Sequence, residues 1–137
     1  MIDPSLIQSY NEAEYHVFDP ALVLKIGELN PALDSLLLEQ GNENWAFITA
    51  SNPYSNLLPE GVNGARFAFL KEAVKSWLYF EGEGAGTDPL WKPEQSLLVL
   101  GISENDAVEI GKSFEQNAIV AGRIYSPPEL IIIQAEV

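Results

Sequence analysis

Apolar residues recur at helical spacing in three segments of the chain, and each segment follows a residue type that caps helices. The caps are Asn30, Asn63 and Ser103, whose side chains can accept a hydrogen bond from a free N–H of the first turn. Asp3, followed by proline, predicts a further short helix at the start of the chain. The apolar positions of the three longer helices are Leu33, Leu36 and Leu37; Phe67, Leu70, Val74 and Trp77; and Ala107, Ile110, Gly111 and Phe114.

Runs of β-favouring residues predict strands between these helices. The run over residues 45–50 is apolar on both faces, which is typical of an interior strand covered by helices. A strand that begins at Tyr79 is expected to end in the glycine-rich segment 81–89, a flexible connection. The remaining predicted strands cover residues 15–18, 22–26, 97–102, 118–121 and 130–133.

This order of elements predicts an α/β (α+β) fold in which residues 1–137 form a single domain. We expect a mixed, twisted sheet of five to seven strands packed with three or four helices. The inner faces of the elements predict a core that contains Phe47, Ile48, Leu70, Val74, Leu98, Leu100, Ile110, Phe114 and Ile132.

Twenty acidic residues stand against seven basic ones, which gives a net charge of −13. This charge argues against direct nucleic-acid binding, because nonspecific affinity for phosphate backbone comes from lysine and arginine. The chain contains no cysteine, which excludes thiolate catalysis and cysteine-ligated metals. No apolar run is long enough to span a membrane and the first residues do not resemble a signal peptide, so we expect a soluble, cytoplasmic protein without membrane contact.

Metal and cofactor sites find little support in the residue spacing. The glycines of segment 82–86 do not lead into a helix as phosphate-binding loops do. A calcium loop that began at Glu81 would place Lys92 where a bidentate glutamate is required. The single histidine, His16, lies on a short predicted strand, and no nucleophile elbow is present. We therefore expect no metal and no cofactor, and no catalytic residue can be assigned.

The loop that follows the strand over residues 45–50 is the more informative feature. In open α/β sheets, ligands settle where strands end, and this loop carries amide and hydroxyl groups. If Asn63 caps the next helix, Arg66 lies in its first turn, where free N–H groups and the helix dipole favour an anion. The alternative is that Asn52 and Pro53 form a turn and Arg66 an ordinary surface ion pair.

Six short motifs occur in one order along the chain: Ile48-Thr49-Ala50-x-Asn52-Pro53, Asn63-x-x-Arg66, Gly82-Glu83-Gly84, Trp91-x-Pro93-Glu94-x-Ser96, Leu98-Val99-Leu100-Gly101-Ile102 and Phe114-x-Gln116-Asn117-Ala118-Ile119. Together they resemble a small bacterial family known only as a domain of unknown function. Ser51 and Glu115 depart from that family, in which an aromatic residue and a glycine are usual. The resemblance implies no activity. It does imply one ligand-binding constellation of Asn52, Asn63, Arg66, Glu83, Trp91, Glu94, Ser96, Gln116 and Asn117.

Two functions compete on these observations. The first is a site for a small-molecule ligand, with an anion as one option, at one edge of the sheet around Trp91. The second is an acidic interaction module that docks a basic protein partner or imitates nucleic acid. Amides, one arginine and a few carboxylates suit recognition better than nucleophilic catalysis, so an enzyme ranks third.

Overall fold

The computed structural model describes residues 3–88 and 90–133. Within these ranges the chain forms four α-helices, Pro4–Glu12 (α1), Pro31–Gln40 (α2), Glu60–Ala73 (α3) and Glu104–Ser113 (α4). The strands are Glu14–Val17 (β1), Leu22–Leu24 (β2), Asn44–Thr49 (β3), Leu78–Ala85 (β4), Glu94–Leu100 (β5), Ala118–Arg123 (β6) and Glu129–Ile132 (β7). A short 3-10 helix, Pro53–Ser55 (η1), follows β3. No helix in the described ranges is long and apolar enough to cross a membrane.

All seven strands join one sheet in the order β2-β1-β4-β5-β3-β6-β7. The predicted α+β class is thereby confirmed, with a strand count and helix count inside the expected range. The expectation of a mixed sheet is corrected, because all six strand pairings are antiparallel. The segment 45–50, which we expected to be interior, provides β3, and β3 is paired on both sides by β5 and β6.

The middle of the chain contains two interlocked crossovers. Strands β3 and β4 are connected through α3 and run in the same direction, but β5 lies between them. Strands β5 and β6 are likewise connected through α4 and are separated by β3. This double split β-α-β topology is that of ferredoxin-like domains. It explains the absence of parallel neighbours in the described sheet, since each parallel pair is split by an antiparallel strand.

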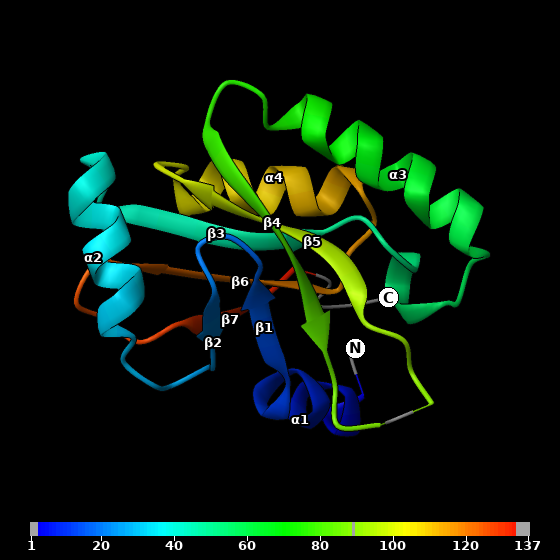
Figure 1. Cartoon of the computed structure of the whole chain (residues 1–137). Helices are drawn as coiled ribbons and strands as arrows, with labels where there is room; N and C mark the ends of the chain where they lie inside the picture. The colour runs from blue at the N-terminus through cyan, green and yellow to red at the C-terminus, as the bar shows by residue number, and fades with distance from the viewer. Residues whose placement is uncertain (1–2, 89, 134–137) are drawn as a thin grey trace.

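The sheet curls, and helices cover both of its faces (Figure 1). Helices α3 and α4 lie together on the outer face, whereas α1 and α2 lie on the inner, concave face. The curl brings the two ends of the sheet close together. After β2, the Gly27 N–H donates a hydrogen bond to the Pro128 carbonyl before β7, at 3.0 Å.

Three of the four predicted helix starts are confirmed by their capping hydrogen bonds. The side chains of Asp3, Asn30 and Ser103 accept from backbone N–H groups of the first turns of α1, α2 and α4, at 2.9 to 3.1 Å. The prediction for Asn63 is wrong, because α3 already begins at Glu60 behind Pro59. A proline followed by an acidic residue is itself a helix-start signal, and it frees the Asn63 side chain for another role.

The prediction of a flexible connection in the glycine-rich segment is also corrected. Residues 81–85 are not a flexible connection, because they continue β4 between β1 and β5. Glycine is needed at position 82 for close approach to the neighbouring strand. A Cβ on Gly82 would lie 2.0 Å from the His16 carbonyl oxygen, and one on Gly84 would contact the Tyr15 ring. The missing side chain at Gly82 is what allows β1 to approach β4 this closely, whereas the contact at Gly84 would be an ordinary one.

Two layers of apolar side chains form the core, one on each face of the sheet. Six of the nine predicted core residues are buried, and Ile110 and Phe114 are partly buried against the outer layer. The prediction for Ile132 is wrong, since this residue is 38% exposed. On the edge strand β7, the preceding residue Ile131 packs against the outer layer. Because successive side chains of a strand point to opposite faces, Ile132 points the other way.

Gly82→Ala should destabilise the fold, because its new Cβ would meet backbone that has little freedom to move. We expect a loss of about 1–3 kcal/mol in the free energy of urea unfolding. Gly64→Ala, on α3 with open space around its Cβ position, is the matched control and should be stabilising. Equal effects of the two substitutions would contradict the close approach of β1 and β4.

Candidate functional site

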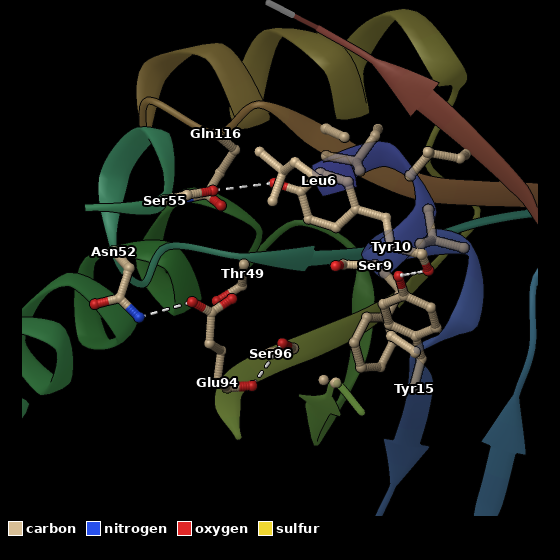
Figure 2. A pocket seen from close by; sticks show the side chains of 18 of the residues that line it. Leu6, Ser9, Tyr10, Tyr15, Thr49, Asn52, Ser55, Glu94, Ser96 and Gln116 are labelled. Carbon is tan, nitrogen blue, oxygen red and sulfur yellow. Dashed lines mark hydrogen bonds between the residues drawn. The ribbon is translucent and has the colours of Figure 1, made fainter. Parts of the chain in front are cut away.

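The concave face of the sheet is hollowed at the end that α1 covers. A cavity of about 420 Å³ lies there, bounded by α1, the loop after β3, the connection between β4 and β5, and the inner face of the sheet. Figure 2 shows Glu94 and Asn52 on one side and Tyr10 and Tyr15 on the other. Apolar groups form the larger part of the lining, and its polar side chains include Ser9, Thr49, Asn52, Ser55, Asp88, Glu94, Ser96 and Gln116.

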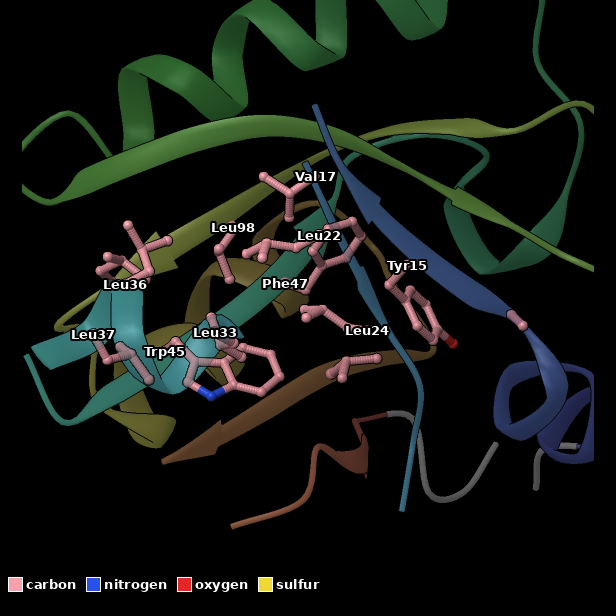
Figure 3. Packing of buried hydrophobic residues seen from close by; sticks show 13 residues of the cluster. Tyr15, Val17, Leu22, Leu24, Leu33, Leu36, Leu37, Trp45, Phe47 and Leu98 are labelled. Carbon is pink, nitrogen blue, oxygen red and sulfur yellow. The ribbon is translucent and has the colours of Figure 1, made fainter. Parts of the chain in front are cut away.

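The two inner helices explain why the cavity lies at this end. Helix α2 buries Leu33, Leu36 and Leu37 against the inner face and fills the opposite end of the curl (Figure 3). Helix α1 has no fully buried residue and leaves space beneath it. The boundary between filled and open halves is formed by Tyr15 and Phe47, whose rings pack edge to face with centroids 5.5 Å apart.

Glu94 is the charged side chain most withdrawn from water in this cavity. It lies at the start of β5, and its Oε2 accepts a hydrogen bond of 2.7 Å from the Asn52 amide. Burial raises the pKa of the Glu94 carboxyl, and hydrogen bonds from Asn52 and Trp91 offset part of this effect. The site thus holds a carboxyl group whose negative charge is poorly solvated.

Asn52 positions Glu94 and is itself held by α3. The Asn52 backbone N–H donates to Asn63 Oδ1 at 3.0 Å, and Asn63 Nδ2 donates back to Asn52 Oδ1 at 2.8 Å. The same Asn52 oxygen accepts from the Leu58 N–H at 2.9 Å. Asn63 therefore acts on the site from behind, through Asn52, and is not part of the cavity lining.

The loop around Asn52 adopts a backbone conformation that few residues favour. Asn52, Tyr54 and Ser55 all have positive φ, at 49°, 51° and 64°. Left-handed conformations at non-glycine residues persist only where surrounding contacts enforce them. Here the Tyr54 N–H donates to the Glu115 carbonyl at 2.7 Å, and Gln116 Nε2 donates to the Ser51 carbonyl at 3.0 Å. The loop is therefore held from both α3 and the end of α4.

Arg66 does not lie in the cavity, and the expected anion site at the first turn of its helix is corrected. Since α3 begins at Glu60, Arg66 belongs to the second turn. Its guanidinium donates to two backbone carbonyls, those of Ala50 at 2.6 Å and Phe114 at 2.5 Å, and pairs with Glu115 at 3.5 Å. Arg66 therefore ties the end of β3 to the end of α4.

The structure brings most of the remaining predicted residues together. Trp91, Ser96 and Gln116 line the cavity with Asn52 and Glu94. Asn117 lies close by, since its Nδ2 donates to Ser55 Oγ at 3.0 Å. Glu83 does not join them, because β4 turns its even-numbered positions towards the cavity and Glu83 points to the outer face.

Sequence reasoning missed the wall on the side of α1, which contributes Leu6, Ser9, Tyr10 and Ala13. These positions have helical spacing, so one face of α1 could have been assigned to a common surface. Nothing in the sequence indicated that β1 would bring Tyr15 opposite Gly84. The described lining carries no lysine, arginine or histidine, and no group of three or more acidic or histidine side chains in the described ranges could hold a metal.

A comparison with protein-family models matches residues 48–119 to the family described as a protein of unknown function, DUF3293. The match covers more than half of the chain. The chain belongs to DUF3293. The matched residues of this DUF3293 protein extend from β3 to β6, and they include Asn52, Glu94 and Gln116 but neither α1 nor β1. No curated protein and no solved structure matches the chain.

Arg66→Ala should destabilise the fold, because the Ala50 carbonyl loses its charged donor and the Phe114 carbonyl keeps only the weaker hydrogen bond from Gln116. We expect a loss of about 2–4 kcal/mol in the free energy of urea unfolding. Arg123→Ala, at an exposed position, is the control and should change stability by less than about 0.5 kcal/mol. If both variants unfolded like the wild type, the structural role of Arg66 would be refuted.

Glu94→Gln should be more stable than the wild type at neutral pH. The folded state binds the Glu94 proton more tightly than the unfolded state, so stability is present at low pH and lost as pH rises from about 4.5 through the raised pKa. The stability difference between variant and wild type should therefore grow in favour of the variant between pH 4 and pH 8, measured by urea unfolding.

Glu60→Gln is the control for this pH series. A hydrogen bond from Lys92 lowers the pKa of the Glu60 carboxyl, so the difference between this variant and the wild type should grow in the opposite direction. A Glu94→Gln variant that becomes less stable than the wild type as pH rises would contradict the inference that burial raises the pKa of the Glu94 carboxyl.

Proposed function

We propose that this DUF3293 protein binds a small molecule in the cavity beneath α1. The observation that carries the proposal is Glu94, a desolvated carboxyl oriented by Asn52 at the wall of a mainly apolar cavity. Small-molecule sites are typically concave and apolar, with a few polar groups that converge on the ligand. A cavity of about 420 Å³ lies within the size range of such sites.

The neighbours of Ser55 and His16 favour binding over catalysis. The hydrogen-bond partners of Ser55 Oγ are the Tyr10 hydroxyl and the Asn117 amide, and neither a histidine nor a carboxylate is among them. His16 is next to Tyr15 on β1, so its side chain points to the face opposite the cavity, where it pairs with Glu14 at 3.0 Å. Neither Ser55 nor His16 therefore forms part of an activated nucleophile–base pair in the cavity.

An interaction module is the weaker alternative. Acidic residues occur on both pairs of helices, for example Glu39 on α2 and Glu109 on α4, and these pairs lie on opposite faces of the sheet. A docking surface for one basic partner would gather its charge on one face. The distribution of acids is therefore better explained by solvation of the whole surface than by a partner.

A thermal-shift screen of metabolites tests the proposal. A ligand at a hundred times its dissociation constant should stabilise the protein by about 2.7 kcal/mol. Ser9→Trp on α1 should occupy the mouth of the cavity and abolish the shift, whereas Gln8→Trp on the same helix, at an exposed position outside the lining, should retain it. Ligands that stabilise Ser9→Trp and the wild type equally would place binding elsewhere and overturn the proposal.

A further inference from the structure

The hydrogen bonds within the cavity wall leave its polar groups mainly as acceptors. The Thr49 hydroxyl donates its proton to the Gln95 carbonyl at 2.7 Å, and the Ser96 hydroxyl donates to the Glu94 carbonyl at 2.9 Å. Both amide protons of Gln116 are also used, on the carbonyls of Ser51 and Phe114. What these three side chains can still offer to a ligand is oxygen lone pairs.

The charged side chains of the lining also favour a ligand that donates hydrogen bonds and carries a positive charge. Glu94 and Asp88 are its ionisable carboxyl groups, and the described lining contains no basic side chain to neutralise them. Aromatic rings of Tyr10, Tyr15 and Trp91 also contribute to the lining. Carboxylates and the faces of aromatic rings both attract cations. An anionic ligand would meet repulsion and would find few donors.

We propose that the ligand is a small organic ammonium ion, whose –NH₃⁺ group binds the Glu94 carboxylate and whose apolar body lies against the Tyr15 and Phe47 side of the cavity. This inference rests on the proposed function and deepens it. A primary ammonium has three donors and no acceptor, which matches a wall of acceptors. The net charge of −13 attracts such a cation over long range at low salt.

Binding of this kind depends on pH. The ammonium requires Glu94 in its charged form, which burial disfavours, so affinity should rise as pH increases through the raised pKa of Glu94. The other ionisable groups that face this site are Asp88 before β5, Tyr10 on α1 and Tyr15 on β1. Asp88 would add to the attraction for a cation, and burial raises the pKa of the Tyr15 hydroxyl, which leaves it neutral throughout.

Isothermal titration calorimetry with three matched probes tests the inference. The probes are 2-phenylethylammonium, the neutral 2-phenylethanol and the anionic 3-phenylpropanoate. We expect the ammonium to bind at least about tenfold more tightly than the other two, and more tightly at pH 8 than at pH 5. Glu94→Gln should weaken the ammonium by at least about tenfold and leave the affinity for the alcohol nearly unchanged. Ser9→Trp should abolish binding, and Gln8→Trp should not.

The contradicting outcomes separate the inference from the proposed function. If the alcohol or the carboxylate binds as well as the ammonium, and Ser9→Trp removes that binding, the cavity is a ligand site but the ammonium class is wrong. If the ammonium binds equally to wild type and Glu94→Gln, its charge is not recognised by Glu94 and the inference fails. If no probe binds and the wider thermal-shift screen gives no ligand sensitive to Ser9→Trp, the proposed function fails as well.

Discussion

The hydrogen bonds of the Asn52 side chain are the interaction on which the site depends. This one amide joins the loop after β3 to Asn63 on α3 and to Glu94 on β5. Each of these groups would cost about 1–3 kcal/mol if it were buried without a partner. The left-handed backbone of the loop is kept because breaking the amide contacts would leave several such groups unpaired at once. The orientation of Glu94 is therefore coupled to the packing of α3.

The curl of the sheet then decides where the cavity lies. Both split crossovers place their helices on the outer face, which leaves the inner face to the two short N-terminal helices. One of them, α2, inserts three leucines and closes its end of the curl, and the other, α1, only covers its end. The cavity is the space that this unequal filling leaves, and the α3 network supplies its polar wall.

The sequence predicted the elements better than their contacts. Helical spacing and capping residues gave the starts of α1, α2 and α4, because both signals are local. The glycines of β4 predict a flexible connection when only local sequence is considered, since the approach of β1, which is distant in sequence, explains why a side chain is excluded at Gly82. The role of Arg66 stays open between an anion site and an ion pair at the level of sequence, because its two carbonyl partners belong to other elements. The family resemblance is what places Asn52, Glu94 and Gln116 in one site. Local sequence patterns alone do not predict that these three residues lie close together.

The most direct test is a measurement of the pKa of Glu94. It asks whether the cavity desolvates this carboxyl group and whether a cation binds to it. Carbon-13 NMR can follow the side-chain carboxyl through a pH titration, with the signal assigned by its loss in Glu94→Gln. The account predicts a midpoint above the ordinary glutamate value of 4.5, and a shift to lower pH when 2-phenylethylammonium is added. A midpoint at the ordinary value that the probe leaves unchanged would contradict it.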